Sequence, residues 1–167
     1  MLRFTGAICI SAACTMYGFI SADRLRKRFC FLREFVTSLS VLETEIEFGR
    51  YELERIFRSM GDKRELCGIY GICAESIKER GIKAAWAAAS DAAADAAALK
   101  REDISAVKSL GAELGKSDVR GQKNAIRRTK ELAAVCEAAA GDEYKRLGRA
   151  YRICGALAGV FCVLMIW

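Results

Sequence analysis

Apolar residues recur at every third or fourth position along most of this sequence, which is the spacing of one face of an α-helix. The first such run extends from Leu25 to Ile46. Gly49 follows it, and glycine ends a helix well because it takes a left-handed conformation at no steric cost. A second, shorter run extends from Leu53 to Met60. The pattern predicts a long amphipathic helix followed by a short one.

The rest of the central chain keeps the helical spacing. Residues 84–98 are mostly alanine, the residue with the highest helix propensity. Ser117 is suited to cap the last helix, because its hydroxyl can accept a hydrogen bond from the backbone. The spacing allows this last helix to run unbroken into the apolar C-terminal end. Further helices are therefore predicted over 66–81, 84–98, 104–114 and from Ser117 onward.

Both ends of the chain are apolar. Residues 4–22 carry no charge and are about as long as the ~20 residues that cross a bilayer as a helix. Residues 153–167 are also uncharged but shorter, so at ~1.5 Å per residue they fall short of the ~30 Å hydrocarbon core. The flanking Arg149 and Arg152 can extend to one interface, and Trp167 suits the other. Transmembrane helices are therefore predicted over 1–23 and 153–167, with Gly155 and Gly159 allowing close helix packing in the membrane.

The basic residues next to these ends predict the orientation, because cytoplasmic loops carry an excess of lysine and arginine. Such residues follow the first apolar segment and precede the second. Residues 24–152 are therefore expected to form a cytoplasmic helical domain, with both termini on the opposite face of the membrane. Cleavage as a signal peptide after Ala22, or as a lipoprotein at Cys14, is a weaker alternative, since neither position is preceded by the residues that cleavage prefers.

Composition narrows the class of function. There is no histidine, the commonest general base and metal ligand, and no proline, which agrees with an all-α helical bundle. The eight cysteines include no C-x-x-C pair. Asp91 and Asp95 lie one helical turn apart but lack a third metal ligand. We therefore expect no enzymatic activity, no metal and no cofactor.

The net charge of +6 is concentrated in a few places. Apart from the apolar borders, the densest basic run lies early in the last predicted helix. An anionic lipid surface or an acidic partner would suit it. Nucleic acid is the alternative ligand, but no aromatic residue is interleaved to stack on bases. The candidate contacts with an anionic surface are Arg120, Lys123, Arg127 and Arg128.

Three carboxylates alternate near the end of the first predicted helix, at Glu43, Glu45 and Glu47. Glu43 and Glu47 share a helix face, because residues four apart are neighbours on a helix surface. Two interpretations remain open. The carboxylates form a docking surface for a basic partner, or they are a solvated face opposite the apolar positions.

Several short motifs follow one another in a defined order. The first is Leu-Glu-Thr-Glu-Ile-Glu-Phe-Gly at 42–49, followed by Leu53, and Trp86 comes next, near the middle of the chain. Two Leu-Gly pairs, Leu110-Gly111 and Leu114-Gly115, then precede Asp118 and Gln122. The last motif is formed by Gly155 and Gly159 in the C-terminal apolar segment. This ordered set resembles the stage III sporulation protein AB family of endospore-forming bacteria, over essentially the whole chain. Glu52 departs from the family pattern, which often has proline there.

The resemblance implies a non-enzymatic platform or assembly component of the channel that joins mother cell and forespore. It implies anchoring in the mother-cell membrane and a cytoplasmic domain similar to that of type II secretion platform protein F. The implied partners are a cytoplasmic secretion-type ATPase and other membrane proteins of the same channel, and self-association is left open. The candidate partner-docking residues are Glu43, Glu45, Glu47, Gly49, Gly111, Gly115, Asp118 and Gln122.

Overall fold

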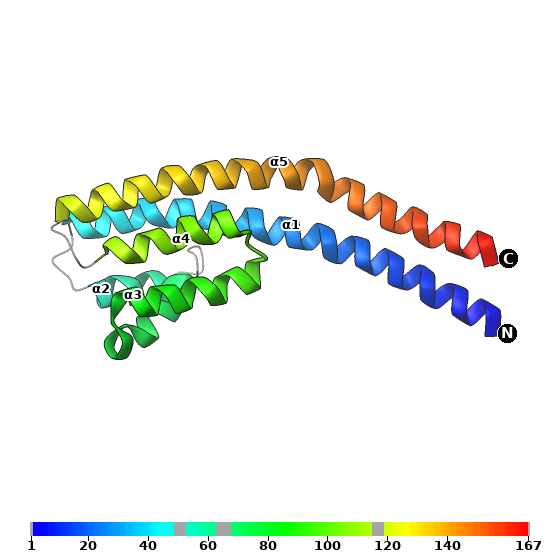
Figure 1. Cartoon of the computed structure of the whole chain (residues 1–167), viewed down its shortest axis with the longest axis horizontal. Helices are drawn as coiled ribbons and strands as arrows, with labels where there is room; N and C mark the ends of the chain where they lie inside the picture. Colours follow the sequence, from blue (N-terminus) through cyan, green and yellow to red (C-terminus); the bar gives the residue numbers. More distant parts are fainter. Residues whose placement is uncertain (1, 49–52, 63–67, 115–118, 167) are drawn as a thin grey trace. The chain divides into compact units, whose positions relative to one another are not determined.

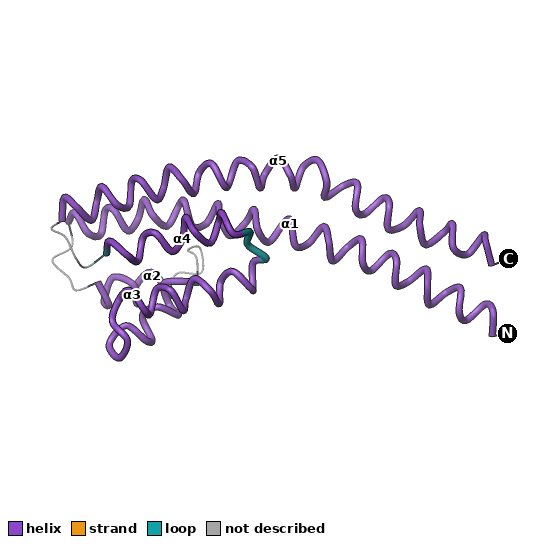
Figure 2. Tube along the Cα trace, in the orientation of Figure 1, coloured by secondary structure: helices purple, strands orange, loops and turns teal. Residues whose placement is uncertain are grey.

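The chain is helical throughout almost all of the computed structural model, which describes residues 2–48, 53–62, 68–114 and 119–166. Within these ranges the helices are α1 (Leu2–Phe48), α2 (Leu53–Gly61), α3 (Ile69–Ala97), α4 (Arg101–Glu113) and α5 (Val119–Ile166) (Figure 1). Figure 2 shows helix in every described element, with a short connection between α3 and α4. The predicted all-α class is therefore confirmed.

The first and last helices are long. α1 continues through the predicted border near residue 23, and α5 runs unbroken from Val119 to Ile166, as its spacing allows. In the ranges that the structure describes, no helix is both long enough and apolar enough to cross a membrane. The transmembrane helices predicted over 1–23 and 153–167 are therefore not supported.

Packing divides the chain into two compact units. The first, here called the terminal helix pair, contains Met1–Phe29 and Ala139–Trp167. The second, the helical bundle, contains Cys30–Ala138 and so includes α2, α3 and α4 with the adjoining parts of α1 and α5. The division reflects contacts between helices, and the predicted boundaries at residues 23 and 153 stay a prediction.

The core of the bundle follows the apolar spacing of the sequence. On α1 the positions Leu32, Phe35, Leu39, Leu42 and Ile46 are all buried, and each is three or four residues from the next. They form one stripe of the helix, because 3.6 residues complete a turn. The amphipathic helix predicted from Leu25 is therefore present.

Four aromatic side chains occupy the centre of the bundle. Phe57 lies 5.5 Å from Tyr70 and 5.6 Å from Trp86, measured between ring centroids, and the Tyr70 and Trp86 rings are also 5.6 Å apart. Phe35 completes the group at 6.4 Å from Trp86. Tilted pairs at these distances each add about 0.5–1.5 kcal/mol beyond the burial of area. Residues from α1, α2 and α3 are thereby joined in one cluster.

The alanine-rich stretch forms the second half of α3. Ala85, Ala89 and Ala93 are buried on the face that also presents Trp86, so the small side chains allow neighbouring helices to approach closely. A kink at Gly81, with φ 73° and ψ 160°, separates this half from the first half of α3. The predicted break near residue 81 is therefore confirmed, although the two halves form one interrupted helix.

Candidate partner-binding surface

Two of the predicted docking carboxylates pair with two of the predicted basic contacts. Glu43 Oε1 lies 2.7 Å from Arg127 Nε, and Glu47 Oε1 lies 2.7 Å from Lys123 Nζ. The residues occur in reversed order on α1 and α5, as antiparallel helices require. Partly exposed pairs of this kind contribute about 0.2–1 kcal/mol each, so they set the register of the two helices more than they stabilise the fold.

A cleft of about 780 Å³ opens beside these ion pairs. It brings the cations of α5 together with a single acidic side chain, so its electrostatic potential favours an anionic occupant. Arg120 lies one turn before Lys123, and no carboxylate among the described residues pairs with it. The lining residues are Glu47, Val119, Arg120, Lys123, Asn124 and Arg127.

The remaining charged and polar candidates are placed differently. Glu45 is half-buried on α1, Gln122 is half-buried on α5 and makes polar contacts, and Arg128 is exposed outside the cleft. Gly49, Gly115 and Asp118 lie outside the described residues, as does the predicted cap Ser117. The docking role of these residues stays a prediction.

Gly111 lies at a packing contact inside the bundle. A Cβ added there would come within 2.4 Å of Trp86 Cδ1, so the α4 backbone lies directly against the indole ring. The Trp86 Nε1 donates a hydrogen bond of 2.8 Å to the Val107 carbonyl on the same helix. Both Gly111 and Trp86 are buried. The absence of a side chain at Gly111 therefore lets Trp86 pack against α4 in the core. This contact explains why a glycine suits the Leu-Gly motif at this position.

Gly155 and Gly159 lie where α1 and α5 approach most closely in the terminal helix pair. A Cβ on Gly155 would meet Gly18 Cα at 3.0 Å, and one on Gly159 would meet Ser11 Oγ at 2.8 Å. Gly18 is the partner that sequence reasoning missed, and a Cβ there would lie 2.6 Å from the Tyr151 carbonyl oxygen. The predicted role in helix packing agrees with this contact, while the membrane setting stays a prediction.

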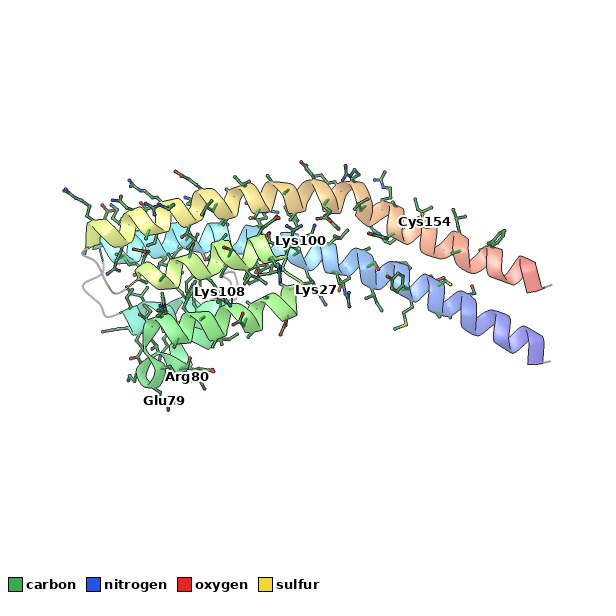
Figure 3. The ribbon with its side chains drawn as sticks, in the orientation of Figure 1. Lys27, Glu79, Arg80, Lys100, Lys108 and Cys154 are labelled. Carbon is green, nitrogen blue, oxygen red and sulfur yellow. The ribbon has the colours of Figure 1, made fainter. Side chains whose placement is uncertain are left out.

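Exposed apolar side chains cover much of the terminal helix pair. Tyr17 is 72% exposed, and Leu157 and Phe161 are 62% and 63% exposed. Cys154 projects from the same part of α5 (Figure 3). A water-exposed surface with this many large apolar groups is typical of an interaction site. Among the residues whose side chains the structure describes, the exposed large apolar ones of this pair are Met16, Tyr17, Phe19, Ile20, Tyr151, Ile153, Leu157, Val160 and Phe161.

One buried ion pair was missed by the sequence analysis. Arg28, one of the basic residues that follow the first apolar segment, is only 4% exposed, and its Nη1 lies 2.6 Å from Glu143 Oε2. The signal was hidden because the partners are far apart in sequence. A charge is buried only when it is paired, so this pair fixes how α1 meets α5 in the terminal helix pair.

The acidic pair on α3 is engaged as well. Asp91 Oδ1 lies 2.6 Å from the Nζ of Lys108, which projects from α4 (Figure 3), while Asp95 is exposed. In the part of the chain that the structure describes, no three potential ligands gather to hold a metal ion. An ion pair between helices is thus the observed use of Asp91.

Comparison with known proteins identifies a family. The family described as stage III sporulation protein AB matches over residues 3–167, which is essentially the whole chain. No curated protein and no solved structure matches significantly. The ordered motifs of the sequence and this match point to the same family.

Proposed function

We propose that this chain, which belongs to the stage III sporulation protein AB family, is a non-enzymatic assembly component of the channel between mother cell and forespore. Family membership gives it a role in sporulation. The channel, the platform role and the lack of chemistry are the proposed part. In this proposal the chain acts by binding, and its bundle corresponds to the helical domain of type II secretion platform protein F.

The observation that carries the binding role is the cationic cleft between α1 and α5. The ion pairs beside the cleft indicate the kind of group that fits, because Glu43 and Glu47 place carboxylates one helical turn apart against Arg127 and Lys123. Arg120 adds a further cation that no described carboxylate neutralises. A partner with an acidic segment therefore has a complementary surface.

The proposed partner is a cytoplasmic secretion-type ATPase. Two of the carboxylates that were candidates for docking, Glu43 and Glu47, are paired with α5, so the basic side of the cleft is the better contact for another protein. Arg127 is 61% exposed in its side chain even while paired, and can exchange one carboxylate for another. Acidic side chains of the partner would therefore pair with the same α5 cations that already pair with α1 carboxylates.

The proposed location is the mother-cell membrane, with the bundle in the cytoplasm. The exposed apolar side chains of the terminal helix pair support an apolar surrounding there, because each Leu, Val or Phe side chain removed from water gains about 1.5–3 kcal/mol. Close contact at Gly18 and Gly155 suits two helices that pack within lipid. A labelling experiment decides the topology. In a variant whose native cysteines are replaced, an impermeant thiol reagent should fail to reach a cysteine placed at the exposed Lys83 in intact cells, and should reach one added after Trp167.

Site-specific photo-crosslinking tests the partner. A photoreactive residue at position 120 should crosslink to the secretion-type ATPase during sporulation, whereas one at Glu79 should not, because Glu79 lies beside the α3 kink and outside the cleft (Figure 3). Arg120→Glu should weaken ATPase binding about tenfold and lower the yield of heat-resistant spores. Arg128→Glu is the matched control, since it makes the same charge change on α5 outside the cleft.

Two results would contradict the proposal. Equal effects of Arg120→Glu and Arg128→Glu would mean that overall charge, and not the cleft, governs binding. Tight, salt-dependent binding of nucleic acid that both variants abolish would favour the alternative of a basic nucleic-acid-binding protein.

A further inference from the structure

A second, smaller cleft lies in the terminal helix pair. It has a volume of about 150 Å³ and lies between α1 and α5. It combines two arginines with two aromatic rings, whereas no aromatic residue lines the cleft of the bundle. The lining residues are Phe19, Ala22, Asp23, Arg26, Tyr144 and Arg152.

The two arginines leave most of their donors available to a ligand. Arg152 donates a hydrogen bond of 3.1 Å from Nε to the Gly148 carbonyl, and this bond orients the guanidinium. The two terminal nitrogens of Arg152 can then donate to a ligand. Arg26 is exposed and pairs with no carboxylate among the described residues. Asp23 is the one acidic lining residue, and Lys27 pairs with it at 3.0 Å. The cleft therefore presents a net positive charge carried by planar forks, the geometry that suits phosphate oxygens.

The polarity of α1 changes within two helical turns at this cleft. Met16, Phe19, Asp23 and Arg26 follow one another along one stripe of the helix, at spacings of three or four. Met16 is 65% exposed and Phe19 is 56% exposed, so the apolar end of the stripe is open. A phosphate ion alone would use only the charged end. A phospholipid matches both ends, because its headgroup phosphate is joined to apolar acyl chains.

We propose that this cleft binds the headgroup of an anionic phospholipid, with Arg26 and Arg152 on the phosphate. The acyl chain lies along the exposed apolar side chains of α1, from Phe19 toward Met16. Tyr144 supplies an aromatic ring with a polar hydroxyl, the kind of group that favours the membrane interface. The inference rests on the proposed membrane location and deepens it, since it names the lipid class that the terminal helix pair selects.

Lipid binding to the full chain in detergent micelles tests the site. Native mass spectrometry should detect one phosphatidylglycerol molecule bound about twentyfold more tightly than phosphatidylcholine, because each basic residue near an anionic headgroup contributes about fivefold. The double variant Arg26→Gln/Arg152→Gln should lose this preference. Arg24→Gln/Arg149→Gln is the matched control: it removes the same charge from exposed positions of the same helices outside the cleft.

Each other outcome overturns the proposal. Equal losses in the two double variants would show that diffuse charge attracts the lipid. Competition by millimolar inorganic phosphate with the same loss of bound lipid would assign the cleft to free phosphate. Circular dichroism of both variants establishes that the helices are retained.

Failure of the site is distinguishable from failure of the proposed function. A chain without lipid preference can still show the predicted topology and crosslink from position 120. A chain that shows neither of those results would fail as a membrane platform, whatever its affinity for phosphatidylglycerol.

Discussion

Replacing Gly111 by alanine tests the contact that positions Trp86. The new Cβ would lie 2.4 Å, 2.6 Å and 2.8 Å from three atoms of Trp86, all of them on the rigid part of the side chain. The indole cannot turn away without losing its hydrogen bond to the Val107 carbonyl. It is also fully buried and packs against Phe57 and Tyr70, so a shift of the ring would press on these side chains. The substitution therefore overpacks the core.

The expected cost is a difference of two terms. Overpacking costs about 1–3 kcal/mol, and a rigid ring in fixed contact places this site near ~3 kcal/mol. Alanine in place of glycine inside a helix gains about 1 kcal/mol. The net destabilisation is about 2 kcal/mol, which lowers the melting temperature of a domain of this size by about 4–8 °C.

Thermal unfolding of the full chain, followed by circular dichroism at the helix band, measures the effect. Gly71→Ala is the matched control, because its Cβ would meet Gly61 Cα at an ordinary 3.6 Å, and the melting temperature should stay level or rise slightly. A double-mutant cycle with Trp86→Phe isolates the contact, since a smaller ring should relieve part of the cost of Gly111→Ala. The reasoning fails if Gly111→Ala stabilises the chain as the control does, or if the two changes are additive.

Three further predictions concern other sites. Gly81→Ala should lower the melting temperature in the same assay, because φ 73° with ψ 160° is nearly restricted to glycine and costs other residues about 1–3 kcal/mol; an unchanged value would contradict this. Glu143→Gln should destabilise the chain by about 2–4 kcal/mol in thermal unfolding, because it removes the carboxylate that lies 2.6 Å from the buried Arg28 guanidinium, whereas Arg28→Met/Glu143→Leu, which also removes the buried charge, should be less destabilising. Burial raises the pKa of Cys73 to about 11, and its side chain is fully buried, so its alkylation at pH 8, read by mass spectrometry, should be at least about a hundredfold slower in the folded chain than in the chain unfolded in guanidinium chloride; comparable rates would refute it. Because the folded chain keeps this proton to a higher pH than the unfolded chain, stability should fall as the pH rises from 9 toward 11.

Only part of the cleft near Arg120 could be predicted from the sequence. The basic run and the alternating carboxylates are visible as patterns, and both contain pairs spaced by four residues. Nothing in a single sequence states that Glu43 meets Arg127 or that Glu47 meets Lys123, because their separation along the chain is set by three intervening helices. Because Glu43 and Glu47 form ion pairs with Arg127 and Lys123, these four residues bind one another in the folded chain.

For the glycines, too, the sequence predicts some roles and the tertiary structure alone reveals others. The sequence marks Gly81 as a break and Gly155 and Gly159 as a packing motif, because glycine in a helical pattern needs a local reason. The partner Gly18 is a lone glycine in an apolar run, so its close approach to Tyr151 is known only once α1 and α5 lie side by side. Gly111 likewise becomes a packing site only through Trp86, which belongs to another helix.

The sequence by itself determined the helical class, the break at Gly81 and the stripe of α1 that is buried from Leu32 to Ile46. These depend on spacing and on local backbone preference, which each short segment carries on its own. Tertiary structure alone decided that Arg28 is buried with Glu143, and that Arg26 and Arg152 share a cleft. Such contacts join distant segments, and their geometry follows from how two helices pack, which local patterns do not encode.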